Sequence, residues 1–192
     1  MPVAAVARLL PLSLLLVAGL LAGCARSDPS VRAVANRKPA VAHRDPEAVK
    51  LQVVKSEDVE SAIQARKGSI VVVDFWATWC PPCKRDFPHL VEMHEKLAGE
   101  GVACLSVSVD DEPDREDALA FLRQQHAEFP NYLLDEEARV WQEKWSIKGV
   151  PVVLVFDRDG KLVRKFDKDD PDNQFSPADV SNLVERMLAT GE

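Results

Sequence analysis

The stretch VDFWATWCPPCK, residues 73–84, decides the fold of this protein and raises the question of what its two cysteines do. The run 69–75, in which β-branched residues predominate, leads into it and is typical of a strand buried on both faces. The residues that follow, 81–97, have the pattern of a helix. Cys80 and Cys83 therefore stand where a buried strand passes into a helix.

This placement favours a redox pair. Backbone N–H groups and the dipole at a helix N-terminus stabilise a thiolate on the first cysteine, Cys80. Cys83 lies one helical turn further on, close enough to attack a mixed disulfide formed at Cys80. Pro81 and Pro82 have a fixed φ and no N–H, so they stiffen the loop between the two sulfurs without preventing the helix.

Three other uses of the two cysteines fit the sequence less well. A structural zinc site needs four ligands, and Cys104, the other cysteine in the body of the chain, falls inside a predicted strand. Covalent haem needs a histidine after the second cysteine, and Lys84 stands there. A permanent disulfide is possible outside the cytoplasm, but so short a loop constrains the unfolded chain little.

Strands and helices alternate along the rest of the body. The pattern predicts strands at 49–54, 69–75, 102–109, 132–134, 151–156 and 161–166, and helices at 56–66, 81–97, 113–126, 136–145 and 177–188. Residues 157–160 are typical of a hairpin turn that ends in glycine. Such an order predicts an α/β sandwich with a mixed sheet.

Composition limits the functional classes. The chain has 192 residues, enough for one domain, and its formal net charge of −7 argues against nucleic acid as a partner. The acidic residues between 110 and 117 are interpreted as a helix start and a solvated face.

The N-terminus has the pattern of a secretion signal. The apolar run 9–22 follows a single arginine and is shorter than the roughly 20 residues that span a bilayer comfortably. It ends in LAGC, residues 21–24, which resembles a bacterial lipobox whose cysteine, Cys24, is lipidated. The alternatives are an ordinary signal peptide with an incidental cysteine, or an uncleaved anchor. We expect a signal peptide at 1–23, a lipidated Cys24 with a flexible tether at 24–48, and a folded domain at 49–192.

Residues 73–84 closely resemble the active-site segment of thioredoxins. Pro88 and the loop Gly149-Val150-Pro151 match the same family. The signal sequence, the dipeptide Pro81-Pro82, the long segment between Cys83 and Pro151 and the phrase FDRDGK at 156–161 bring the resemblance toward the TlpA/ResA-like, membrane-anchored thiol–disulfide oxidoreductases. The resemblance covers about residues 49–190. The resemblance implies a thioredoxin-like α/β/α sandwich with a mixed central sheet and an extra helix and strand inserted at mid-domain.

It also implies roles for particular residues. Cys80 would be the attacking thiolate and Cys83 the resolving thiol. Pro151 would form a cis peptide bond beside them, and Val150 would pair through its backbone with a bound substrate. Trp79 would shield Cys80. An ordinary proline at the start of a strand is the alternative for Pro151.

Asp74 ends the predicted strand six residues before Cys80. A buried carboxyl has a raised pKa and can carry a proton to or from Cys83. Thioredoxins keep an acid at this place and many TlpA-like proteins do not, so the chain departs here toward plain thioredoxin. It departs again at Val152 and Val153, where the TlpA-like pattern commonly has two threonines. The alternative for Asp74 is a strand-end carboxylate that caps a loop.

These features predict an extracytoplasmic, lipid-anchored reductase of disulfides in exported proteins, facing the periplasm or the exterior. By the resemblance it would draw electrons from a membrane thiol reductase and need no cofactor or metal. A copper-binding or chaperone module of the same fold is the alternative, although such modules use a longer cysteine spacing and a distal histidine. A peroxiredoxin would need threonine at the position of Ala77.

Overall fold

The computed structural model describes residues 46–171 and 174–191. The predicted signal peptide, Cys24 and nearly all of the predicted tether lie outside these residues. The tether's last three residues, Pro46–Ala48, form the 3-10 turn η2, and Glu47 pairs there with Arg123 at 3.5 Å.

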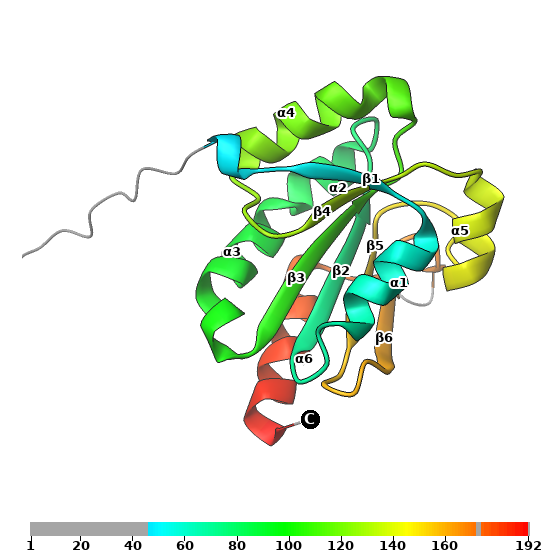
Figure 1. The fold of residues 1–192 in the computed structure, drawn as a ribbon. Helices are drawn as coiled ribbons and strands as arrows, with labels where there is room; N and C mark the ends of the chain where they lie inside the picture. The colour runs from blue at the N-terminus through cyan, green and yellow to red at the C-terminus, as the bar shows by residue number, and fades with distance from the viewer. Residues whose placement is uncertain (1–45, 172–173, 192) are drawn as a thin grey trace, which may run out of the picture. The chain divides into compact units, whose positions relative to one another are not determined.

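Six strands form one mixed sheet in the order β1-β4-β3-β2-β5-β6 (Figure 1). The strands are β1 (Leu51–Val54), β2 (Ile70–Trp76), β3 (Val102–Ser108), β4 (Asn131–Leu134), β5 (Val152–Phe156) and β6 (Leu162–Asp167). The first four in the sheet order run parallel, whereas β5 is antiparallel to β2 and β6 is antiparallel to β5. The predicted mixed sheet is confirmed.

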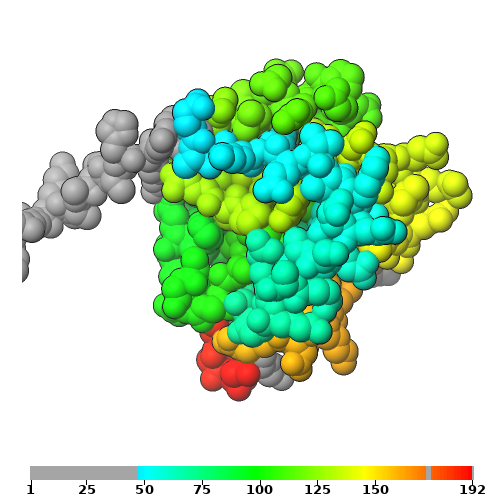
Figure 2. Space-filling view, viewed as in Figure 1, coloured from blue at the N-terminus to red at the C-terminus, as the bar shows by residue number. Residues whose placement is uncertain are grey.

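Helices cover both faces of this sheet. They are α1 (Ser56–Gln64), α2 (Pro81–Asp86), α3 (Pro88–Leu97), α4 (Arg115–Gln125), α5 (Ala138–Trp145) and α6 (Pro177–Thr190), with short 3-10 turns η3 (Ala98–Glu100) and η4 (Glu112–Asp114). In Figure 1, α1 crosses in front of the sheet and α6 lies behind it. The space-filling view shows β1, α1 and α5 covering much of the front face (Figure 2).

The central strand β2 is apolar at every position except Asp74, because both of its faces are buried. All seven of its residues are buried. Because side chains alternate across a strand, Val72 and Trp76 join the core under α3, α4 and α6, while Val71, Val73 and Phe75 join the core under α1 and α5. Burial on both faces favours such an apolar run, in which Asp74 is the one polar residue.

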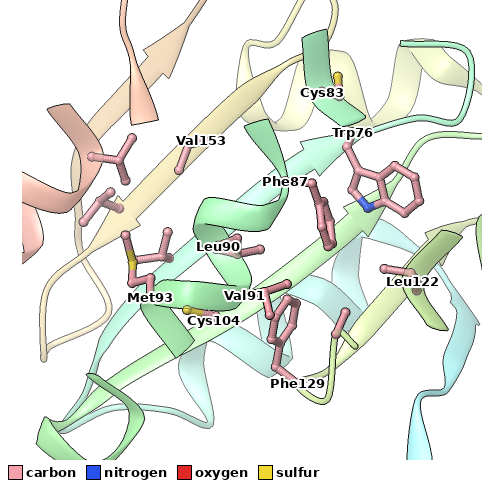
Figure 3. Packing of buried hydrophobic residues seen from close by; sticks show 14 of the residues in the cluster. Trp76, Cys83, Phe87, Leu90, Val91, Met93, Cys104, Leu122, Phe129 and Val153 are labelled. Carbon is pink, nitrogen blue, oxygen red and sulfur yellow. The ribbon is translucent and has the colours of Figure 1, made fainter. Parts of the chain in front are cut away.

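The mid-domain insertion expected from the resemblance is the segment from α4 to β4. It places β4 between β1 and β3, and it brings Phe121 of α4 against Trp76 and Phe87. Figure 3 shows Phe87 and Trp76 packed together above Phe129. The insertion therefore completes the aromatic core directly beneath the cysteine loop.

Several predicted boundaries need correction. The helix predicted for 81–97 is two helices, α2 and α3, because Pro88 has no N–H to continue the hydrogen-bond ladder. Ser56 was predicted as an N-cap but is the first helical residue, and Lys55 is the cap, its N–H donating to Asp58 at 2.9 Å. Other predictions hold: Ser176 caps α6, and Gly160 closes the β5–β6 turn with a φ of 78°.

Candidate functional site

The two cysteines lie at the start of α2, as the sequence predicts. Cys80 is the N-cap residue, and its sulfur accepts a hydrogen bond from the Cys83 N–H at 3.3 Å. The two residues form a disulfide bond, with Cα atoms 5.3 Å apart. Both are buried, and Trp79 beside them is 62% exposed. The first turn of α2 thus donates a hydrogen bond to the sulfur of Cys80, and the same bond would stabilise a thiolate on that sulfur.

The loop before Cys80 is held by a buried carboxylate. Asp110, which is 1% exposed, accepts hydrogen bonds from the Thr78 N–H at 2.9 Å and from the Thr78 hydroxyl at 2.6 Å. The Ser108 hydroxyl donates to the same carboxylate at 2.6 Å. This network fixes the backbone two residues before Cys80.

The position of Asp110 contradicts one prediction made from the sequence. The acids at 110–117 were interpreted as a helix start and a solvated face, and that is wrong for Asp110 because it is buried. The signal that could have found it is its position just after β3. The carboxyl ends of the parallel strands β2 and β3 meet at one edge of the sheet, so Asp110 and Thr78 necessarily come close there.

The loop that leads into β5 lies on the other side of the cysteines. The Val150–Pro151 peptide bond is cis, as the resemblance implies. The carbonyl oxygen of Val150 lies 3.7 Å from the sulfur of Cys80. The backbone of Val150 therefore lies directly beside the sulfur of Cys80.

A small cavity lies behind the cysteines and joins Cys83 to Asp74. Its volume is about 40 Å³, and Asp86, His89 and Pro151 also line it. A cavity of this volume is large enough for a water molecule, which needs roughly 10–15 Å³ of space for its centre. The lining is mostly apolar, and Asp74, Asp86 and His89 supply its polar side chains beside Cys83. Cys83 and Asp74 thus line one small, mainly apolar cavity, which is a short path for a proton between them.

The electrostatics of Asp74 suit that use. The carboxyl is 7% exposed, and burial, reinforced by the negative charge of Asp86, raises its pKa from 3.8 to about 8, while Lys168 acts in the opposite direction. A group whose pKa lies near neutrality can both accept and release a proton under ordinary conditions.

The remaining cysteine of the described residues lies in the core and takes no part in the disulfide. Cys104 on β3 is buried, and burial raises the pKa of its thiol to about 12. Figure 3 shows it beside Val91 and Met93 under α3, away from Cys83. This confirms the prediction of an inert core thiol.

Comparison with known proteins assigns the chain to a family. A model described as the AhpC/TSA family matches residues 45–172, more than half of the chain. The chain belongs to the AhpC/TSA family. The curated relatives and the solved structure described next carry names that refer to thiol–disulfide chemistry.

Two curated relatives and one solved structure illustrate the likeness. The thiol:disulfide interchange protein HelX of Rhodobacter capsulatus is 28% identical over 126 residues, which cover 66% of this chain and 68% of HelX. The thiol-disulfide oxidoreductase ResA of Bacillus cereus is 29% identical over 120 residues, 62% of this chain and 66% of ResA. The thioredoxin domain of a thiol-disulfide oxidoreductase from Bacteroides vulgatus is 26% identical, with a TM-score of 0.55 over 65% of this chain and 82% of that domain.

These matches confirm the thioredoxin-like fold and the TlpA/ResA-like resemblance. They also establish the reaction class, a disulfide oxidoreductase.

Proposed function

We propose that this protein is an extracytoplasmic, lipid-anchored oxidoreductase that reduces disulfides in exported proteins. The observation that carries the proposal is the Cys80–Cys83 pair at the start of α2, with the Val150 carbonyl 3.7 Å from the sulfur of Cys80. The names of HelX and ResA, an interchange protein and an oxidoreductase, support the same chemistry.

The reaction begins with the reduced protein. The Cys80 thiolate attacks one sulfur of a substrate disulfide, so a bond forms between Cys80 and that sulfur, and the other substrate sulfur leaves as a thiolate. The helix N-terminus stabilises the attacking thiolate. The backbone of Val150 and Pro151 aligns the substrate chain, and Trp79 limits access to Cys80 from the other side.

Cys83 completes the reaction. Its sulfur attacks Cys80, the bond from Cys80 to the substrate breaks, and the substrate leaves as a second thiolate. Asp74 takes the proton that Cys83 gives up, through the cavity that both residues line. The substrate has gained two electrons, and the protein is left with the Cys80–Cys83 disulfide, the state present in the structure. A membrane thiol reductase would return the two electrons.

The proposed location rests on the N-terminal sequence. The apolar run 9–22 and the lipobox-like residues that end at Cys24 precede a polar segment with the composition of a tether. Acyl chains on Cys24 would hold the domain at a membrane, since each buried CH₂ adds roughly 0.8 kcal/mol of affinity. Within the part of the chain that the structure describes, no helix is both long and apolar enough to cross a membrane.

A trapping experiment in intact cells tests the proposal. In a Cys83→Ser variant, substrates that have reacted at Cys80 cannot be released, so we expect mixed disulfides with exported proteins in the membrane fraction. Adding Cys24→Ala should move these complexes out of the membrane fraction without reducing their number.

The Cys80→Ser, Cys83→Ser double variant is the control and should trap nothing. Complexes with cytoplasmic proteins alone would contradict the proposed location. A Cys83→Ser variant that traps no partner, combined with stoichiometric copper binding by the wild type, would contradict the proposed reaction and favour the copper module.

A further inference from the structure

Lys168 connects the loop that contains Pro151 with the helix α2. It follows β6 directly, and its main-chain N–H donates to the carbonyl oxygen of Pro151 at 3.5 Å. Its ammonium group donates to the carboxylate of Asp86, which lies on α2 three residues after Cys83. One residue thus binds both the loop that contains Pro151 and the helix that begins at the cysteine pair.

This ion pair is partly withdrawn from solvent. The side chains of Asp86 and Lys168 are 20% and 19% exposed, respectively. The ammonium group also lies 5.1 Å from the centre of the Phe175 ring, which lines the cavity. Arg85 makes a second contact to Asp86 at 2.9 Å, but the Arg85 side chain is 68% exposed. Charges in such a place are screened less than charges on an open surface.

The pair acts on the same cavity as Asp74. Asp86 lines that cavity together with Asp74 and Cys83. The other titratable groups that face Asp74 are His89 of α3, which is exposed at the cavity wall, and the buried thiol of Cys104 on β3. Lys168 is the cation that acts on Asp74, and Asp86 is the anion.

The two charges oppose one another at Asp74. The negative charge of Asp86 raises the pKa of Asp74, and the positive charge of Lys168 lowers it. Burial alone would raise the pKa of Asp86 itself, but hydrogen bonds from Lys168 and Arg85 outweigh burial and lower it. Asp86 is therefore ionised whenever Asp74 titrates.

We propose that Asp86 and Lys168 are positioning residues that control when Asp74 accepts the proton of Cys83. The proposal rests on the function proposed above and adds two residues to its second step. In that step the Cys83 sulfur bonds to Cys80, the bond from Cys80 to the substrate breaks with its electron pair on the substrate sulfur, and the Cys83 proton moves to Asp74. The positive charge of Lys168 favours the ionised form of Asp74, which can take this proton. The negative charge of Asp86 opposes that ionisation.

The test follows the second step with glutathione disulfide as the probe. Full-length reduced protein is mixed with excess glutathione disulfide, quenched in acid at set times, and the glutathione adduct of Cys80 is quantified by mass. The rate at which the adduct decays is measured from pH 5 to pH 10. We expect Asp86→Asn to shift the midpoint of this profile to lower pH and Lys168→Met to shift it to higher pH, each by about half a pH unit or more.

Three further variants make the result specific. Lys168→Arg keeps the charge and should restore the wild-type profile. Arg85→Gln removes the exposed partner of the same carboxylate and should move the midpoint much less than Lys168→Met. In an Asp74→Asn background, Asp86→Asn and Lys168→Met should both leave the profile unchanged, since the group on which they act is gone.

Shifts in the same direction for both variants, or shifts that persist without Asp74, would overturn the role of the pair. A lack of shift in variants that resolve the adduct normally would do the same. A wild-type protein that forms no adduct at any pH contradicts the proposed function itself, and this outcome is readily told apart from an unshifted profile.

Discussion

Replacing Cys80 with serine should reduce disulfide reductase activity by at least about 10³-fold, because a hydroxyl cannot form the mixed disulfide on which both steps depend. Cys83→Ser should behave differently. It keeps the first attack but cannot complete the second, so it should end as a mixed disulfide with the substrate. The measurement is a single turnover of the pre-reduced protein with insulin, with thiols and adducts counted by mass: the wild type should release reduced insulin, and Cys83→Ser should stay bound to it.

Cys104→Ser is the matched control for this pair of variants. It also replaces a cysteine by serine, but at a buried site away from Cys83, and it should keep reductase activity in whatever fraction remains folded. Loss of activity per folded molecule in Cys104→Ser, or reduction of insulin by Cys80→Ser at the wild-type rate, would contradict the assignment of Cys80 and Cys83.

Replacing Asp74 with asparagine should slow the release of substrate from Cys80 by about 10²-fold at pH 9, because asparagine cannot accept the proton of Cys83. The pH dependence should change with it. In the wild type the rate of this step should rise with pH until Asp74 is ionised, near its pKa of about 8. In Asp74→Asn that rise should be absent, and decay of the glutathione adduct measures both effects.

Stability provides the control for Asp74→Asn. The folded-state pKa is raised above its unfolded value, so between pH 3.8 and about 8 the folded protein holds a proton that the unfolded chain has lost. The contribution of this carboxyl is therefore greatest at low pH and falls as pH rises, by roughly 1.4 kcal/mol per pH unit, until Asp74 ionises in the folded state.

Asp74→Asn should remove this loss, so the oxidised variant should be more stable than the wild type at pH 9. Urea unfolding at pH 5 and pH 9 measures the difference. A variant that is slow and also less stable at pH 9 would point to a packing defect and would contradict the proton-carrying role of Asp74.

The local patterns of the sequence predicted most of the fold. The largely apolar run of β2 indicated a strand buried on both faces, and in the structure β2 lies within the sheet between β3 and β5. Gly160 closes the turn it was expected to close, and the cysteine pair begins a helix. These features depend on residues within a few positions of one another, where backbone preference and periodicity act.

The groups that surround the cysteines were harder to predict. Lys168 and Asp86 are 82 positions apart, and neither side chain belongs to a motif. Asp110 was interpreted as solvated because its neighbours in sequence are acidic, yet it is buried against Thr78, which is 32 positions away. Such contacts depend on which strands are neighbours in the sheet, and periodicity along one segment carries no information about that.

The reduction potential of the Cys80–Cys83 pair decides whether this protein acts as a reductase or as an oxidant. The protein is equilibrated with defined ratios of reduced and oxidised dithiothreitol or glutathione, and the fraction of disulfide is measured after acid quenching and alkylation. A reductase that depends on a membrane electron donor should have a potential near that of thioredoxin, about −270 mV. A value near about −120 mV, that of a strong oxidant, would mean that electrons flow in the opposite direction and would contradict the proposed function.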